Sequence, residues 1–352
     1  MSDKERAIVA LLKQNPYSTQ QQIAEEIGLS RPAVANMISA MQKKGYIIGR
    51  AYILPTRKEI ICVGGANIDR KFFLKKELIE GTSNPVSVSE SVGGVARNIA
   101  ENLGRMEHTV RLLTVAGKDA DWEKIASKTS GFAEVQSVKF SPTGTTGSYS
   151  AVVSPSGEMD VAFANMDIYE ELSPTYLEEQ KSFLRNASLL ISDLNVPKES
   201  VTYLRDFAKE EKIPLAIIPV SSPKMDRLPA VLEGIDWLIC NKDEAETLLN
   251  TSFQQEEAVF EALETIQVRG VRHVIITSGA KGVYVKSDDQ PGFFVKAITP
   301  KKVVDVTGAG DAFVSATLNA FLAGNKIEDC VQAGLVHATA TIESTTTVLE
   351  EI

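Results

Sequence analysis

The sequence predicts an α/β fold with a mostly parallel, doubly wound sheet, a small β lid and a separate N-terminal helix-turn-helix domain. Three observations predict this arrangement. Strand-like and helix-like patterns alternate from residue 59 onward, two extended stretches interrupt the alternation, and the first 55 residues show short capped helices instead. With 352 residues and 43% hydrophobic content, the chain can bury a large core.

Residues 1–55 are interpreted as a winged helix-turn-helix domain. Apolar spacing predicts a helix over 3–14, Thr19 and Ser30 can cap helices over 20–27 and 31–42, and Gly28 lies in the turn between those two. Residues 43–54 alternate like a small hairpin, the wing. A helical packing or dimerisation module is the alternative. If the domain binds DNA, the residues at the recognition helix or near phosphates are Arg31, Asn36, Ser39, Lys43, Lys44 and Arg50.

Charge is unevenly distributed along the chain. Residues 1–58 carry nine Lys and Arg against four Asp and Glu, whereas the remainder carries 28 against 42. A basic N-terminal segment on an acidic body indicates that this segment alone meets a polyanion.

Residues 56–352 are expected to form the α/β domain. Strands are predicted at 59–65, 110–115, 189–193, 215–220, 237–241 and 274–278, and helices at 98–105, 174–184, 199–209, 243–249, 256–269, 312–322 and 327–342. The interrupting stretches, about 70–92 and 138–163, are predicted to form a lid. Ligands of such a sheet collect at the carboxyl ends of its strands.

The stretch 305–313 carries the chemistry around which the chain is organised. Gly308 and Gly310 allow the backbone to approach a ligand, and the helix that follows offers unpaired N–H groups to phosphate oxygens. Asp311 lies where a carboxylate can accept a proton from a hydroxyl that attacks a γ-phosphate. An ordinary helix start with a glycine turn is the alternative.

Four further groups of polar residues or glycines lie near predicted strand ends or helix starts. Each also has a plain structural interpretation: a strand-end or glycine turn, a helix cap, or a hairpin turn. As binding groups, a carboxylate and amides can hold sugar hydroxyls, an Asn with a Glu can organise the waters of Mg²⁺, and a glycine-containing strand–turn–strand can follow a nucleotide. The groups are Asn67 with Asp69; Gly93 and Gly94 with Asn98; Asn241 with Glu244; and Thr277, Gly279 and Gly282.

The order of these motifs resembles the ribokinase-like (PfkB) carbohydrate kinase family over about residues 58–352. The resemblance implies a ribokinase-like fold and an ATP- and Mg²⁺-dependent kinase, with Asp311 as the base for a sugar 5′-hydroxyl. The amides of Gly308, Ala309 and Gly310 would then stabilise the transferring phosphoryl group. It further implies that the ribose is held by Asn67, Asp69, Gly93, Gly94 and Asn98, that Asn241 and Glu244 arrange Mg²⁺ through water, that Thr277, Gly279 and Gly282 line the ATP site, and that Asp305 and Thr307 are candidates for a K⁺ site.

Segments 83–85, 93–103, 157–159 and 165–168 also resemble the pseudouridine kinase group of this family, some of whose members carry an N-terminal helix-turn-helix. Pseudouridine is therefore the expected substrate; another nucleoside, ribose or another sugar, and a regulator that only senses such a ligand, are the alternatives. Relatives often carry Asp before Pro-Val-Ser, where this chain has Ile218. Candidates for the base, ribose or a phosphate, each with turn polarity or solvation as its plain alternative, are Asn165, Asp167, Asp193, Asn195 and Lys224.

Composition excludes several classes of protein. Three cysteines and three histidines lie too far apart in the sequence for a structural zinc site. No apolar run reaches the ~18 residues of a membrane span, and the charged N-terminus lacks a secretory signal, so a cytoplasmic protein is expected. A homodimer is expected, because the lid can pair with a neighbour and helix-turn-helix proteins often read two half-sites.

Overall fold

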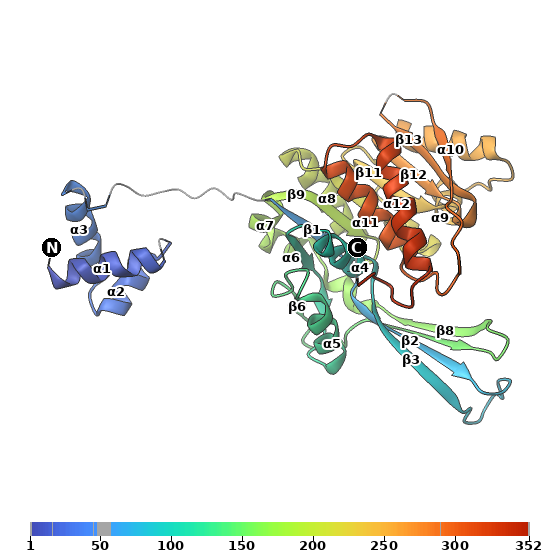
Figure 1. Cartoon of the computed structure of the whole chain (residues 1–352), viewed down its shortest axis with the longest axis horizontal. Helices are drawn as coiled ribbons and strands as arrows, with labels where there is room; N and C mark the ends of the chain where they lie inside the picture. The colour runs from blue at the N-terminus through green and yellow to red at the C-terminus, as the bar shows by residue number, and fades with distance from the viewer. Residues whose placement is uncertain (1, 16, 45, 48–57, 289, 351–352) are drawn as a thin grey trace. The chain divides into compact units, whose positions relative to one another are not determined.

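The computed structural model describes residues 2–15, 17–44, 46–47, 58–288 and 290–350 (Figure 1). The chain divides into two compact units, Met1–Thr56 and Arg57–Ile352. Most of the predicted wing, Arg50 included, lies outside the described residues.

The N-terminal unit contains the helix that apolar spacing predicts and the two helices that the caps Thr19 and Ser30 predict. Thr19 Oγ1 accepts the N–H of Gln22 and Ser30 Oγ accepts the N–H of Ala33, while Gly28 closes the turn with a left-handed φ of 67°. The helices are α1 Asp3–Gln14, α2 Gln20–Ile27 and α3 Arg31–Lys43, and their core consists of Ile8, Ile23, Ala24, Val34, Ile38 and Met41.

The second unit is built on an eight-stranded sheet in the order β14-β13-β12-β11-β10-β9-β1-β4. The strands from β4 to β12 run parallel, and β13 and β14 are antiparallel additions at one edge. In sheet order the strands are β14 Phe293–Lys296, β13 Gly282–Ser287, β12 His273–Thr277, β11 Trp237–Asn241, β10 Leu215–Ile218, β9 Ala187–Asp193, β1 Glu59–Val63 and β4 Val110–Leu113.

Helices cover both faces of this sheet, as its apolar strands require. Along β1, Ile60 and Cys62 face one core and Ile61 and Val63 face the other. Helices α4 Val95–Arg105, α11 Ala309–Leu322 and α12 Ile327–Ile342 pack on the first face. The second is covered by α6 Pro174–Glu179, α7 Lys181–Arg185, α8 Lys198–Glu211, α9 Lys242–Leu249 and α10 Glu256–Val268.

The lid is a four-stranded sheet in the order β3-β2-β7-β8 that projects from the body (Figure 1). Its strands are β2 Asn67–Leu74, β3 Val86–Gly93, β7 Ser148–Val153 and β8 Met159–Asn165. Strand pairing puts Asp69, Lys71, Ser89, Ser91 and Tyr149 on one face. The other face carries the apolar side chains of Phe72, Val88, Val152, Val161 and Phe163.

Three differences from the sequence prediction concern local structure. The helix predicted at 174–184 is two short helices, α6 and α7, and no element was predicted for α5 Ala120–Thr129, which Asp119 caps through the Trp122 N–H. Asn67 and Asp69 lie on lid strand β2 and not in a loop beyond β1. The remaining short elements are β5 Val115–Ala116, β6 Lys139–Phe140, η1 Asp167–Glu171, η2 Ser222–Arg227 and η3 Gly279–Lys281. None of the helices in the described part of the chain has the length and apolar content of a membrane span.

Gly94 permits the close approach of α4 to the end of β1. Its φ is 100°, and a Cβ there would lie 2.4 Å from the carbonyl oxygen of Gly65. The N–H of Arg97 in turn donates to that same carbonyl at 3.2 Å. Both the backbone conformation and the space therefore require glycine.

Replacing Gly94 with Ala is expected to lower the free energy of unfolding by about 2–4 kcal/mol, because backbone strain and a clash with Gly65 add together. Urea denaturation measures the change. Gly131→Ala is the matched control: it has no atom within 4 Å of the added Cβ and no positive φ, so its change should stay below about 1 kcal/mol. Equal stability of the two variants would show that the close approach of α4 to the end of β1 tolerates a side chain at residue 94.

Candidate active site

The N-terminus of α11 presents unpaired backbone N–H groups. Gly308 precedes it with a φ of 83°, and a Cβ there would lie 2.2 Å from the carbonyl oxygen of Thr347. The N–H of Ala309 donates to Val306 at 3.3 Å, but the N–H groups of Gly310 and Asp311 have no backbone acceptor among the described residues. Space in front of Gly310 is open. These amides and the helix dipole form a site suited to an anion.

The partly buried carboxylate of Asp311 lies in the first turn of the same helix. Asn98 Nδ2 on α4 donates to Asp311 Oδ2 at 2.8 Å. Burial raises the pKa of the Asp311 carboxyl to about 7, opposed by the bond from Asn98 and reinforced by the carboxylates of Asp193 and Asp69. A carboxylate with a pKa near neutrality is suited to proton transfer at physiological pH.

Arg97 fixes the orientation of the Asn98 amide. Its Nη1 donates to Asn98 Oδ1 at 3.0 Å, so the amide NH₂ must face Asp311, and its Nε donates to Thr129 Oγ1 at 3.0 Å. Arg97 is 2% exposed as a residue. Its guanidinium pairs with the carboxylate of Glu101, which also pairs with Arg105. The sequence analysis did not single out Arg97; an arginine among the apolar positions of a buried helix is the signal that could have found it.

The lid contributes a second carboxylate. Asn67 Nδ2 donates to Asp69 Oδ1 at 2.6 Å, and a Cβ at Gly93 would lie 2.1 Å from Asp69 Oδ2. Burial raises the pKa of Asp69 to about 6, while Asn67 and Lys71 act to lower it. Gly93 thus leaves the room that Asp69 occupies.

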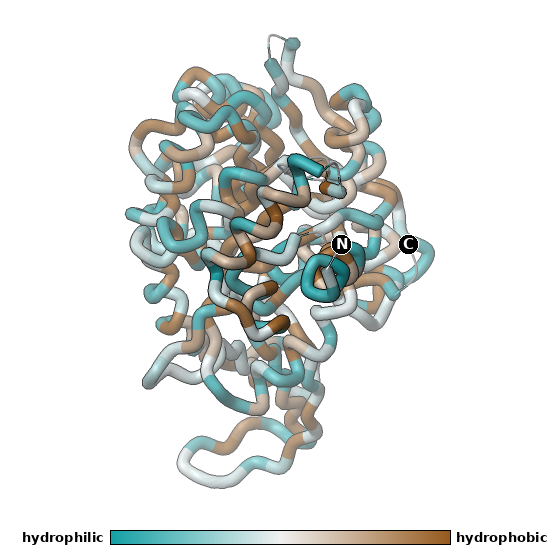
Figure 2. The backbone as a smooth tube through the Cα atoms, turned by 90° about the vertical axis from the view of Figure 1, so that its left-hand side faces the viewer, coloured by the Kyte–Doolittle hydropathy of each residue, from teal (hydrophilic) through white to brown (hydrophobic). Residues whose placement is uncertain are grey.

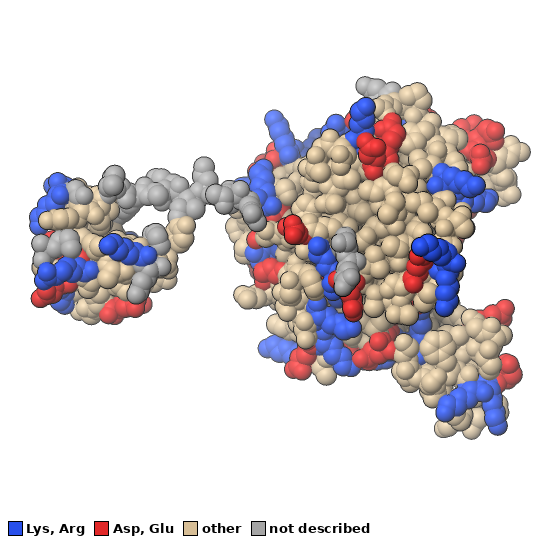
Figure 3. Space-filling view, in the orientation of Figure 1, with Lys and Arg blue, Asp and Glu red and all other residues tan. Residues whose placement is uncertain are grey.

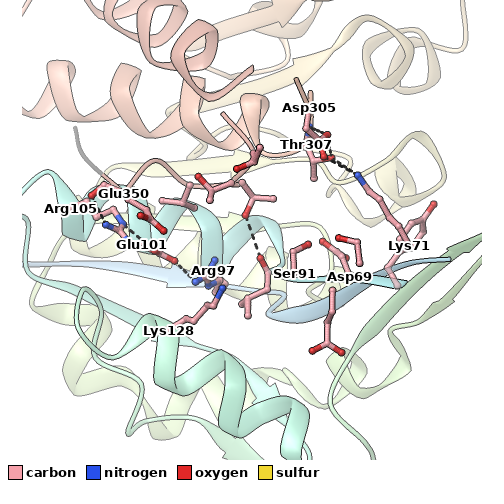
Figure 4. Close-up of a pocket in the computed structure, with 18 of the residues that line it drawn as sticks. Asp69, Lys71, Ser91, Arg97, Glu101, Arg105, Lys128, Asp305, Thr307 and Glu350 are labelled. Atoms are coloured by element: carbon pink, nitrogen blue, oxygen red, sulfur yellow. Dashed lines mark hydrogen bonds and ion pairs between the residues drawn. The ribbon is translucent and has the colours of Figure 1, made fainter. Parts of the chain in front are cut away.

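A cavity of about 560 Å³ lies between the lid, α4, the loop before α11 and the C-terminal segment 345–350 (Figure 4). Asp69 and Lys71 enter it from the lid, and Asp305 and Thr307 from the loop. Asp311 and Asn98 are not among its lining residues; they are linked to its wall through Arg97.

Comparison with known families identifies the second unit. The model of the pfkB family of carbohydrate kinases matches residues 57–351. The chain belongs to this family. A winged helix-turn-helix DNA-binding model matches residues 1–48, so the predicted fold class is confirmed for both units.

Similarity to proteins named as kinases, in sequence and in structure, supports the assignment to the pfkB family. The chain is 27% identical to the uncharacterized sugar kinase YeiI of Escherichia coli (strain K12), covering 96% of this chain and 93% of that protein. It is 28% identical to the pseudouridine kinase of the same organism, covering 78% and 87%. Among solved structures, a carbohydrate kinase from Agrobacterium tumefaciens superposes with a TM-score of 0.72 at 30% identity, covering 83% and 92%. Arabidopsis thaliana ribokinase complexed with ribose and ATP shares the fold, with a TM-score of 0.74 at 19% identity over 83% and 95%.

The side chain of Asp193, a predicted contact of the base or ribose, is occupied by protein partners. Its side chain is fully buried, and its carboxylate accepts N–H groups from Gly65, Ala96 and Asn195 at 2.8–3.1 Å. Asn195 is likewise engaged, because its NH₂ donates to Asp193 and its Oδ1 accepts from Lys224. Burial lowers the pKa of Lys224. Asp193 and Asn195 therefore hold loops together, and neither side chain is available to a ligand.

The residues assigned to nucleotide and metal also have structural partners. Asn241 and Glu244 cap α9 reciprocally: Asn241 Oδ1 accepts the Glu244 N–H and Glu244 Oε2 accepts the Asn241 N–H, each at 2.8 Å. The cap uses only one of the two carboxylate oxygens of Glu244, Oε2. Thr277 ends β12 and Gly279 begins η3 in the turn that follows. Gly282 is buried against β14, where a Cβ would lie 2.1 Å from the carbonyl oxygen of Val295.

Three other predicted residues lie elsewhere on the surface or in the core. Asn165 ends lid strand β8 and donates to Thr145 Oγ1 at 3.1 Å, and Asp167 is exposed at the start of η1. Ile218 is buried in β10. No group of three or more His, Cys, Asp or Glu suited to a metal lies in the described part of the chain.

Arg97→Met is expected to lower the free energy of unfolding by about 3–5 kcal/mol, because it removes the charge that compensates buried Glu101. Glu101→Leu should lower the free energy of unfolding by a comparable amount, because it leaves the buried charge of Arg97 without its partner. In the double variant neither charge remains, so its loss should be smaller than the sum by about 1–3 kcal/mol. Urea unfolding of the wild type, the two single variants and the double variant measures the coupling free energy between Arg97 and Glu101. Losses of stability that simply add in the double variant would contradict an ion pair between them.

Proposed function

We propose that the chain is an ATP-dependent kinase that phosphorylates the 5′-hydroxyl of pseudouridine to pseudouridine 5′-phosphate. One observation carries this proposal: the Asp311 carboxylate, with a pKa near 7, lies beside open backbone N–H groups at the start of α11. A base next to an anion site is the equipment for phosphoryl transfer to an alcohol. Similarity to the Escherichia coli pseudouridine kinase favours this substrate. Another nucleoside or ribose is the alternative within the same chemistry.

In the proposed reaction, Asn67 and Asp69 hold the ribose hydroxyls from the lid, with Gly93 and Gly94 allowing the main chain to approach. Asp311 takes the proton of the 5′-hydroxyl as the bond from its oxygen to the γ-phosphorus forms and the bond to the ADP oxygen breaks. The amides of Gly308, Ala309 and Gly310 stabilise the developing charge; the Ala309 N–H would exchange its 3.3 Å bond to Val306 for this role.

The nucleotide would lie along Thr277 and Gly279, with Lys224 near a phosphate. Mg²⁺ neutralises charge on the phosphates in such reactions. Because Mg²⁺ keeps most of its waters, Asn241 and the Oε1 of Glu244, which the cap does not use, fit a role through water.

The apolar outer face of the lid supports a homodimer. Val88, Val161 and Phe163 on that face are 56%, 36% and 63% exposed. Along the backbone of the projecting lid, at the bottom of Figure 2, hydrophobic positions in brown alternate with hydrophilic positions in teal. Pairing with the lid of a second copy would cover them.

Replacement of Asp311 with Asn should lower kcat by at least about a hundredfold, because the base is lost, while nucleotide binding stays near that of the wild type. A screen of ATP consumption with pseudouridine, uridine, adenosine, ribose and fructose measures turnover and identifies the acceptor. The variant should also be more stable at pH 8: the raised pKa means that ionisation of Asp311 destabilises the folded state as the pH rises from about 4 to about 7. Unchanged turnover would remove Asp311 from the mechanism.

The pH profile of kcat/KM should rise about tenfold per pH unit on the acid side and level off near pH 7, because Asp311 must be ionised to accept a proton. Asp69, whose pKa is raised to about 6, could produce a similar limb. Asp69→Asn distinguishes the two: the limb near 7 should persist while KM for the acceptor rises. A wild-type profile flat down to pH 5 would contradict the assignment.

The N-terminal unit supports a second activity, DNA binding. Arg31, Asn36 and Ser39 are exposed on α3, and Lys43 and Lys44 are exposed at its end. Both basic and acidic side chains lie on the visible face of this unit (Figure 3). Together with the winged helix-turn-helix match, this favours a kinase that also contacts DNA.

Exchange of Lys43 and Lys44 for Gln should weaken binding to duplex DNA of any sequence and reduce the slope of log affinity against log salt by about 1–2. Fluorescence anisotropy of labelled duplex at several salt concentrations measures both. Lys13→Gln, an exposed position on α1, is the matched control and should have a smaller effect. Absence of DNA binding by the wild type at low salt would leave this unit as a packing module.

A further inference from the structure

An ammonium group from the lid lies where the sequence analysis expected a K⁺ ion. Lys71 Nζ on β2 lies 3.0 Å from Asp305 Oδ2 and 3.4 Å from Thr307 Oγ1 (Figure 4). Asp305 and Thr307 belong to the loop that leads into α11, so the contact joins segments more than 200 residues apart.

The carboxylate of Asp305 is fully engaged in this arrangement. Its Oδ1 accepts both the N–H of Thr307 at 2.9 Å and the Thr307 hydroxyl at 2.7 Å, and its Oδ2 accepts the Lys71 ammonium. Although partial burial opposes it, the bonds from Thr307 and Lys71 hold the pKa of Asp305 below its ordinary value. The carboxylate is therefore ionised near neutral pH, and a K⁺ ion beside its Oδ2 would have to displace the ammonium.

The lid places Lys71 and the sugar-side carboxylate together. Residues two apart on a strand share a face, so Lys71 and Asp69 project from β2 toward the same cavity. Their neighbours on β3 are Ser89 and Ser91, whose short side chains leave room for the long lysine. Any movement of the lid that carries Asp69 to a ligand also carries this cation to the loop before α11.

We propose that Lys71 is a built-in monovalent cation, which takes the place of K⁺ beside the anion site and ties the lid to the loop that carries Asp305. The chain therefore does not respond to K⁺. Removal of the ammonium exposes Asp305 and Thr307, with the hydroxyls of Thr345, Thr346 and Thr347 lining the same cavity, and so creates a K⁺ site. The consequence for activity rests on the proposed kinase function; the consequence for cation binding does not.

The first test is the Tm of the full-length protein in KCl and in choline chloride at equal ionic strength. Wild type should show the same Tm in both salts, whereas Lys71→Met should be more stable in 100 mM KCl than in choline chloride by a few degrees. Lys76→Met, an exposed lysine of the lid beyond β2, is the matched control and should behave as wild type. A K⁺-specific rise in the wild-type Tm, or none in Lys71→Met, would overturn the proposal.

The second test uses the acceptor found in the ATP-consumption screen. Wild-type kcat should be equal in the two salts, and Lys71→Met should lose activity in choline chloride and regain at least part of it in KCl. A wild-type rate that requires K⁺ overturns the proposal. If no acceptor is phosphorylated, the proposed kinase function fails, and the Tm comparison still decides the role of Lys71.

Discussion

The arrangement of the site depends on one buried carboxylate, Asp193 at the end of β9. Four N–H contacts join it to the loop after β1, the first turn of α4 and its own loop. Burial raises the pKa of Asp193, and a buried carboxyl group is costly unless its hydrogen bonds are made. The folded state therefore favours bringing these segments together. This junction determines where α4 begins, and α4 carries Asn98 to the carboxylate of Asp311.

Two sets of contacts, one behind Asp311 and one from the lid, determine which chemistry the site can support. Behind Asp311, the chain of Glu101, Arg97 and Asn98 fixes the direction of an amide, and burial gives the carboxylate a pKa near neutrality. In front, the lid contributes polar residues from one face of β2, and Lys71 connects that face to the loop before α11. The body of the domain therefore carries the proposed base, whereas the lid that projects from it carries the groups proposed to hold the sugar.

The sequence predicted the elements whose signal is local. Continuous apolar runs identified the parallel strands, helical spacing of apolar residues identified α1, and caps identified α2 and α3. Helix α5 was missed because its short amphipathic pattern lies between two irregular segments. Polarity at a strand end does not distinguish a residue that contacts a ligand from one that joins loops, which is why Asp193 and Asn195 were assigned to the ligand and Lys71 and Arg97 were overlooked. Those distinctions depend on contacts between distant segments.

The account rests on Asp311 as the acceptor of a substrate proton. The most direct measurement is a crystal structure of the protein with pseudouridine and a non-hydrolysable ATP analogue. The account predicts the 5′-oxygen within about 3 Å of an Asp311 carboxylate oxygen, with the γ-phosphate at the amides of Gly308 to Gly310. A bound nucleoside whose hydroxyls all lie beyond hydrogen-bond reach of Asp311, with the phosphates away from the start of α11, would contradict it.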